Sequence, residues 1–213
     1  MSEEQEIAMG KEADPQIIAQ FGLYDDTAIQ SFISSKGKQM AAISHRPKLE
    51  HSFRVLNSEV VNAFAVPGGY VYFTRGIMAH FNSEADFSGV LGHEIGHVER
   101  RTGNLTQARL IYHETLRGWR QLGNRAAIAH QLECFGFLAI HAEEPQRAAK
   151  IFGTAEAVRE KIQARMTDYE RVEYDQAVTH LRSMLTEAEF SDLWEKGRSM
   201  TMEQAIEFAL DES

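Results

Sequence analysis

The chain has 213 residues, of which 43% are hydrophobic and 25% are charged. This balance is typical of a globular protein and excludes a disordered chain. The formal net charge of −9 argues against a nucleic-acid partner held by phosphate contacts. No apolar run approaches the length of about 20 residues that a transmembrane helix needs, so no transmembrane segment is expected.

The first residues of the sequence bear on the compartment. The acidic start of the sequence has no signal-peptide pattern, so the sequence as written predicts a cytoplasmic protein. A periplasmic location is the alternative if a signal peptide was removed.

The single cysteine, Cys134, excludes an internal disulfide and a cysteine-rich metal site, and we expect it to be a buried small hydrophobe.

The first part of the chain combines two helices with a small sheet. Apolar residues at helical spacing predict two helices between Glu3 and Ile43. A period of two and many β-branched and aromatic residues then indicate strands. These strands are expected near residues 49–55, 60–65 and 70–74. Pro67-Gly68-Gly69 predicts a tight turn between the last two, because glycine accepts positive φ.

A third helix follows the strands. Asn82 or Ser83 is expected to cap it, with Asp86 placed to complete a capping box. The helix carries the sequence His93-Glu94-Ile95-Gly96-His97, the most specific chemical feature of the chain.

This motif predicts a zinc site. Residues four apart on a helix lie one turn above each other, so the imidazoles of His93 and His97 can share one Zn²⁺. Glu94 is displaced by roughly a third of a turn. There it can accept a proton from a water molecule that zinc has made more acidic, and later pass it to a leaving amine. The motif therefore predicts His93 and His97 as metal ligands, Glu94 as the catalytic base and zinc-dependent hydrolysis of peptide bonds.

The alternative is a surface helix that matches a short pattern by chance. Gly92 and Gly96 each cost a helix about 1 kcal/mol relative to alanine. Such glycines are expected where a helix closely approaches another backbone or a substrate, which favours the metal site.

No strand pattern follows Arg101, and helical patterns continue almost to the end. They contain a repeat, because Ala108 followed by Tyr112 is echoed by Ala148 followed by Phe152. A small residue followed four positions later by an aromatic residue is typical of interlocking helical repeats. The predicted fold is α+β and mostly helical, with a small N-terminal sheet in residues 1–101 and a helical-repeat half in residues 102–213. The boundary is expected near residues 99–104.

Two late helices have clear end signals. Capping boxes are expected at Thr186 with Glu189 and at Thr201 with Gln204. Gly197 is expected to cap a helix C-terminus.

Several residues of the helical half are expected to have no functional role. Trp119 and Trp194 are interpreted as packing residues. His113, His130 and His141 show no ligand spacing and are expected on the surface or at helix caps.

Several segments of the first half resemble the HtpX and CAAX-prenyl-protease type of gluzincin metallopeptidases. These segments are EEQEIAMG (3–10), NAFAVPGGYVY (62–72), Gly76-Ile77, NSEA (82–85) and LGHEIGHV (91–98). The likeness is greatest to the soluble, exported bacterial chaperone-proteases and the related mitochondrial Oma-type enzymes. It implies a zincin-like helix with His93 and His97 as zinc ligands, Glu94 as base, and a peptide or protein substrate. It also implies that the strand at 70–74 forms a cleft edge that pairs with an extended substrate.

One part of the family pattern is missing. Members take a third zinc ligand from a glutamate in a later Glu-x-x-x-Asp motif, which this sequence lacks. Glu156 lies at a suitable separation, with Glu143 and Glu144 nearby, but each is expected to be a solvated helix residue. Two histidines alone would hold zinc weakly, because a catalytic site normally has three protein ligands.

Residues 103–213 resemble tetratricopeptide-like repeats. The specific likeness is to the C-terminal helical region of large bacterial signal-transduction ATPases with LuxR-type regulators. It is carried by residues 103–105, 108–109, 119–125, 147–149, 151–156, 193–198 and 202–206. It implies a protein-interaction scaffold with a protein partner. The phosphate-binding loop and the DNA-reading module of those regulators are absent from the sequence.

Three interpretations therefore stay open. The chain is an active zinc endopeptidase whose third ligand lies in the helical half. Alternatively, it has an incomplete zinc site and acts as an inactive helical-repeat interaction module. In the third interpretation it is a chimera of two unrelated fragments. A plain helical bundle without a partner is the alternative to the repeats.

Overall fold

The computed structural model describes residues 3–42, 48–101, 103–166 and 168–211. The chain divides into two compact units, residues 1–108 and 109–213, whereas the sequence placed the boundary near residues 99–104. Ile43 and Thr102, which the sequence analysis used as a helix end and a turn residue, lie outside the described residues. None of the described helices is long and apolar enough to cross a bilayer.

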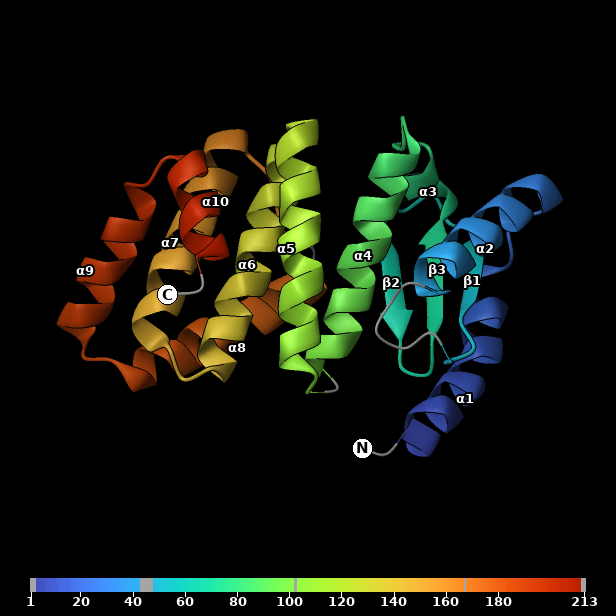
Figure 1. Cartoon of the computed structure of the whole chain (residues 1–213), viewed down its shortest axis with the longest axis horizontal. Helices are drawn as coiled ribbons and strands as arrows, with labels where there is room; N and C mark the ends of the chain where they lie inside the picture. The colour runs from blue at the N-terminus through green and yellow to red at the C-terminus, as the bar shows by residue number, and fades with distance from the viewer. Residues whose placement is uncertain (1–2, 43–47, 102, 167, 212–213) are drawn as a thin grey trace. The chain divides into compact units, whose positions relative to one another are not determined.

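The chain is mostly helical, with one three-stranded sheet, as the sequence predicted (Figure 1). The elements of the first unit are α1 (Glu3–Phe21), α2 (Thr27–Ala42), β1 (Ser52–Leu56), β2 (Ala63–Val66), β3 (Tyr70–Thr74), α3 (Arg75–Met78) and α4 (Glu84–Arg101). The division between the units falls within α5 (Leu105–Leu122). The remaining helices are α6 (Arg125–His141), α7 (Pro145–Ile162), α8 (Asp168–Met184), α9 (Glu187–Arg198) and α10 (Met202–Leu210).

The sheet has the strand order β1-β3-β2. β1 runs parallel to β3 with Ser52 opposite Tyr70, and β2 runs antiparallel to β3 with Ala63 opposite Phe73. β3 is therefore the central strand, paired along both sides. The prediction that β3 forms a cleft edge is wrong, because its backbone groups are already used by β1 and β2. The free edges of the sheet belong to β1 and β2.

The turn between β2 and β3 is as predicted. Gly68 and Gly69 have φ values of 86° and 88°, a region that only glycine adopts readily. Glu6 of α1 is buried, and its carboxylate accepts a hydrogen bond from the Gly68 N–H at 3.1 Å. This contact fixes the turn against α1.

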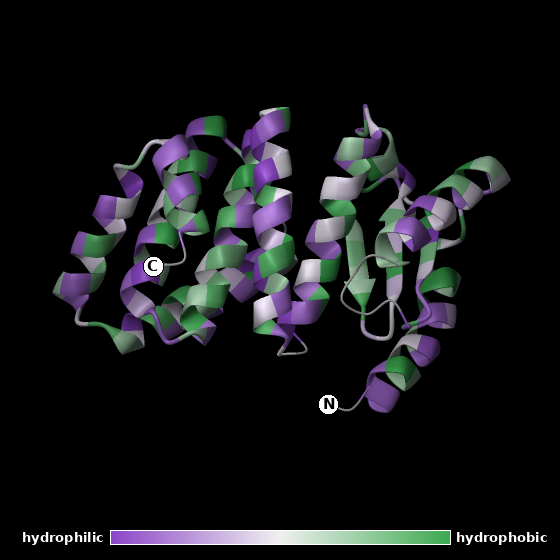
Figure 2. Ribbon diagram, in the orientation of Figure 1, coloured by the Kyte–Doolittle hydropathy of each residue, from purple (hydrophilic) through white to green (hydrophobic). Residues whose placement is uncertain are grey.

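One face of the sheet packs against α2 and α4. Ile33 of α2 and Leu91 of α4 are fully buried and belong to one apolar cluster. The strands contribute alternate residues to it, namely Phe53, Val55, Ala63, Val71 and Phe73. Successive side chains of a strand point to opposite faces, so the other set faces α1. Figure 2 shows the strands mostly in the green of hydrophobic residues, whereas α1 begins in purple.

The α1 face of the sheet is polar at its centre. Tyr72 is fully buried, and its hydroxyl donates a hydrogen bond to Asp14 at 2.7 Å. Arg54 donates to the second oxygen of the same carboxylate at 3.0 Å. Burial of the phenol and its bond to Asp14 raise the pKa of Tyr72 above its ordinary value. A single carboxylate on α1 thus binds both β1 and β3.

The second unit is built around α7, which packs against α6, α8, α9 and α10. α6 and α7 form a helical hairpin. The described residues after Arg101 contain only helices, as predicted. All four residues of the repeat are fully buried, and so is Cys134, in agreement with its predicted role as a small hydrophobe. Trp119 is buried as expected.

The helix ends follow the sequence signals with one exception. The capping boxes at Thr186 with Glu189 and at Thr201 with Gln204 are both present. Gly197, however, lies inside α9, and the helix is capped by Ser199. The prediction of a C-terminal glycine cap there is wrong.

Candidate metal centre

The helix that carries the histidines begins at the predicted cap, Ser83, although the Asp86 side chain bonds to the residue before the cap. The Asp86 N–H donates to the Ser83 hydroxyl at 3.2 Å, and the Asp86 carboxylate accepts from the Asn82 N–H at 2.9 Å. Phe87 and Leu91 are buried in the apolar cluster beneath the sheet. These contacts fix the position of α4 on the first unit.

His93 and His97 converge on one side of α4. Their Nε2 atoms are 2.9 Å apart, and their ring centroids are 4.4 Å apart with the planes nearly perpendicular. His93 is buried and His97 is half-buried. The spacing of four residues predicted this convergence.

The two imidazoles fit a shared metal ion. Two nitrogens at the usual zinc distance in a tetrahedral site would be about 3.3 Å apart. The observed 2.9 Å differs from this by only a small shift of flexible side chains. A neutral imidazole has one donor and one acceptor nitrogen, so both Nε2 atoms can face a metal with the protons on Nδ1. The donor set, two imidazoles, is one that zinc accepts.

Glu94 follows His93 directly and is half-buried on α4. Gly96 is buried. The close approach of another backbone or a substrate at Gly92 and Gly96 stays a prediction.

The C-terminal end of α4 is closed by a glycine turn. Gly103 has φ of 89°, and the N–H of Asn104 donates to the Glu99 carbonyl at 2.8 Å. The Asn104 side chain also donates to the buried Glu99 carboxylate at 2.7 Å. The last turn of the histidine-bearing helix is therefore fixed by backbone and side-chain bonds.

Glu156, the candidate third ligand, is engaged within the second unit. One of its carboxylate oxygens accepts hydrogen bonds from the Trp194 indole at 2.8 Å and from Arg198 at 2.5 Å. Glu156 is thus not the freely solvated residue that the sequence suggested. Its carboxylate already balances the charge of Arg198 and satisfies the Trp194 N–H.

The two other glutamates lie in the turn between α6 and α7. Glu143 adopts a left-handed conformation with φ of 59° at the end of α6. Glu144 is the N-cap residue of α7, and its carboxylate lies 3.7 Å from Arg147. Both carboxylates belong to helix ends.

The sequence analysis missed a ligand-type pair on α6. His130 and Cys134 are four residues apart, and a ring nitrogen of His130 lies within 4.8 Å of the Cys134 sulfur. The statement that His130 shows no ligand spacing is wrong, because cysteine was not considered as its partner. The same spacing of four that revealed His93 and His97 would have found this pair.

The two remaining histidines differ in environment. His113 is buried against Phe135, at 5.4 Å between ring centroids, so the expected surface position is wrong. His141 is exposed at the end of α6, where a ring nitrogen lies 2.8 Å from the Phe137 carbonyl, as a cap residue would.

Two converging histidines beside a glutamate on one helix are characteristic of metal-dependent peptidases. Sequence comparison is more specific. Residues 28–164, well over half of the chain, match peptidase family M48. The chain therefore belongs to this family of metallopeptidases, whose members bind a metal ion. The matched range continues past residue 101 into α7.

Individual relatives support the same assignment. The "Mitochondrial metalloendopeptidase OMA1" of Arabidopsis thaliana is 38% identical over 77 residues, which are 36% of this chain and 16% of that protein. The "Beta-barrel assembly-enhancing protease" of Yersinia pestis is 31% identical over 101 residues, 47% of this chain and 21% of the relative. The protein of the same name from Escherichia coli (strain K12) is 29% identical over 97 residues, 46% and 20% of the two chains. The chain thus spans 16% to 21% of the length of these relatives.

The resemblance of the first half to the HtpX and Oma types is confirmed by these matches. The likeness of residues 103–213 to tetratricopeptide-like repeats of signal-transduction ATPases stays a prediction.

Proposed function

We propose that this chain is a zinc-dependent metalloendopeptidase that hydrolyses peptide bonds in peptide or protein substrates. The observation that carries the proposal is the convergence of the His93 and His97 Nε2 atoms at 2.9 Å on α4. Membership of peptidase family M48 supports it, as do relatives that are named as a metalloendopeptidase and a protease.

The residues have distinct roles. His93 and His97 would hold the zinc ion. When bound, zinc supplies Lewis-acid chemistry, which polarises a peptide carbonyl and makes water more acidic. Glu94 takes the proton of the attacking water on its carboxylate and delivers it to the leaving amine. A helix fixed at both ends holds these three groups in a constant relation, which a proton transfer over hydrogen-bond distance requires.

A third protein ligand is needed for tight binding. Glu156 is a poor candidate, because removing its carboxylate from Arg198 and Trp194 would leave a cation and a half-buried N–H without their partner. The third ligand is therefore not assigned to any of the glutamates that the sequence singled out.

The unassigned third ligand favours a second candidate function. If no residue completes the site, the chain is an inactive peptidase relative in which a tetratricopeptide-like second unit binds a protein partner. The second unit, with its well-packed core around α7, would then carry the function.

Zinc content per chain, measured on protein purified without added metal, tests the proposal. We expect about one zinc in the parent chain and in Glu94→Gln, and none in His97→Ala, since two ligands on one helix are the core of the site. Cleavage of an unfolded protein substrate should be present in the parent and lost in Glu94→Gln. Proteolysis that survives Glu94→Gln would exclude the mechanism, and a parent without zinc would favour the interaction module.

His130→Ala and Cys134→Ser belong in the same series. A loss of zinc in these variants would assign them to a metal site, and unchanged zinc would show that their spacing is structural.

A further inference from the structure

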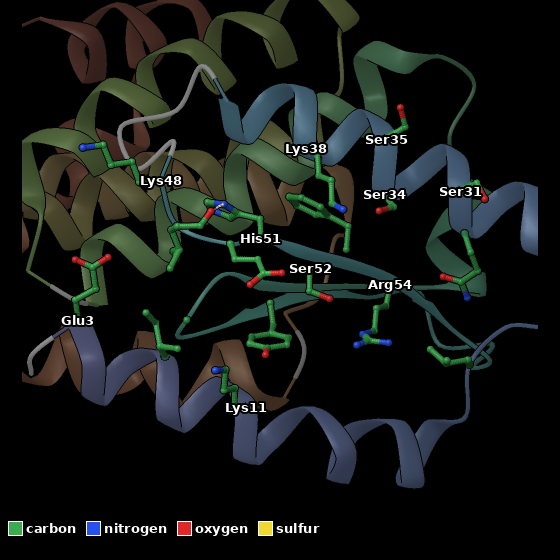
Figure 3. Close-up of a pocket in the computed structure, with 18 residues that line it drawn as sticks. Glu3, Lys11, Ser31, Ser34, Ser35, Lys38, Lys48, His51, Ser52 and Arg54 are labelled. Atoms are coloured by element: carbon green, nitrogen blue, oxygen red, sulfur yellow. Dashed lines mark hydrogen bonds between the residues drawn. The ribbon is translucent and has the colours of Figure 1, made fainter.

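A large cavity of the first unit lies at the edge of β1, between α1 and α2 (Figure 3). Its volume is about 1170 Å³, somewhat above the usual range of ligand pockets. None of its lining residues belongs to α4. β1 and β2 are opposite edges of the sheet, and α4 packs beside β2. The groove is therefore separate from the histidines.

Backbone groups of β1 face this groove. Ser52 donates its N–H to Gly69 on the β3 side, so by alternation along the strand Phe53 and Val55 direct their N–H and C=O groups to the free edge. The Gln30 side chain occupies the position of a neighbouring strand at Val55. Its amide oxygen accepts from the Val55 N–H at 2.9 Å, and its amide nitrogen donates to the Val55 carbonyl at 2.8 Å.

Among the described residues, the outer edge of β1 has hydrogen-bond partners at Val55 and none at Phe53. Beyond Val55, Leu23 forms an antiparallel bridge with Leu56. Phe53 lines the cavity, and among the described residues we find no hydrogen-bond partner for its outward backbone groups. An incoming chain that continues the line of Leu23 and Gln30 would run antiparallel to β1 and pair with Phe53.

The groove is positively charged in a chain of net charge −9. Lys11, Lys38 and Lys48 line it, and none of them has an ion pair with another described residue. Figure 3 shows Lys11 on α1 and Lys38 on α2 extending from opposite sides into the space beside β1. The acidic residues of the lining are Glu3 and Glu50. An occupant with acidic side chains would complement this charge.

We propose that this groove binds an extended acidic peptide segment, which adds to the free edge of β1 as an antiparallel strand. Backbone pairing at Phe53 gives the strand its direction, in the manner of other edge-strand complexes. Successive side chains of a strand point to opposite faces, so neighbouring glutamates of the peptide reach Lys11 on one side and Lys38 on the other. The site is an attachment point for a protein partner or substrate, apart from the histidines, and does not depend on zinc.

Fluorescence anisotropy tests the proposal with a fluorescein-labelled, N-acetylated peptide of sequence Thr-Glu-Glu-Thr-Glu-Glu-Thr. The full-length parent and Glu94→Gln chains should bind it equally and saturably, and more weakly at higher salt. The Lys11→Glu/Lys38→Glu variant should bind about tenfold more weakly or worse. The matched control, Lys161→Glu/Lys196→Glu, makes the same change of charge on the second unit and should bind like the parent. Equal binding by both double variants would overturn the proposal.

Two measurements separate strand addition from simple anion binding. A peptide with N-methyl groups at alternate residues cannot complete a strand ladder and should lose most of its affinity. In the parent chain, the amide of Phe53 should exchange with solvent more slowly when the unmodified peptide is bound. Full binding of the N-methylated peptide, or displacement by inorganic phosphate at equal concentration, would show an anion site and overturn the proposed strand. Since the parent is measured directly, a variant that fails to fold does not decide the result.

Discussion

Gly153 of α7 and Gly197 of α9 allow the backbones of these two helices to meet. A Cβ atom on Gly153 would overlap the Trp194 carbonyl oxygen, and one on Gly197 would overlap the Lys150 carbonyl oxygen. The Thr154 hydroxyl donates to the Gly197 carbonyl at 2.7 Å across the same crossing. Helix axes approach this closely only where neither helix carries a side chain.

Gly197→Ala should therefore destabilise the second unit. Its methyl group would push against backbone atoms, which cannot rotate away, and we expect a loss of about 1–3 kcal/mol in the free energy of unfolding. Gly118→Ala is the matched control, because a Cβ there meets nothing within 4 Å. That change removes a helix-interior glycine and should stabilise by up to about 1 kcal/mol. Denaturant unfolding of both variants checks this, and equal stability of Gly197→Ala and the parent would contradict the crossing.

The Gln30 amide should stabilise the fold through its hydrogen bonds to the edge of β1. Gln30→Glu keeps an acceptor for the Val55 N–H but loses the bonds donated to the Val55 and Tyr24 carbonyls. A carboxylate facing two carbonyl oxygens should cost about 1–3 kcal/mol of stability. Gln39→Glu makes the same chemical change at an exposed position of α2 and should stay within about 0.5 kcal/mol of the parent. Chemical denaturation compares the two, and a similar effect of both changes would argue against the bonds of Gln30.

Tyr72 should resist ionisation at high pH. Burial, and then the bond to Asp14, raise the pKa of its phenol above the ordinary value of about 10. The folded chain thus keeps a proton that the unfolded chain loses. The stability that this provides is fully present below pH about 10 and is lost as the pH rises from there toward the folded-state pKa.

A spectroscopic titration measures this. In the folded parent, Tyr72 should remain protonated when exposed tyrosines have ionised, and so should Tyr174, whose pKa is also raised by burial. Tyr72→Phe should leave Tyr174 as the one late-ionising tyrosine of these two, and should lose less stability above pH about 10. An equal number of late-ionising tyrosines in Tyr72→Phe and in the parent would show that Tyr72 is not one of them.

Glu156→Gln should leave the zinc content unchanged. The carboxylate is bound by Trp194 and Arg198, so the expected effect is on the packing of α7 with α9 and not on the metal. Elemental analysis of this variant beside His97→Ala checks it. A fall in zinc to the level of His97→Ala would show that Glu156 is a ligand after all.

The amino-acid sequence by itself determined the local features of this protein. A period of two located three strands, and a hydroxyl residue followed three residues later by Asp, Glu or Gln located the N-terminal caps of α4, α9 and α10. The convergence of His93 and His97 followed from their spacing on a helix. These features depend on residues within a turn or two of each other, whose geometry the backbone itself fixes.

The tertiary structure alone decided which distant groups meet. It made β3 the central strand and β1 an edge strand, and it placed Gly197, which the sequence predicted as a helix cap, at the crossing of α7 and α9. It also gave Glu156 its partners, Arg198 and Trp194, some 40 residues further along the chain. Each of these contacts depends on which surfaces pack together to bury the two apolar cores. A local sequence pattern does not specify which surfaces these are.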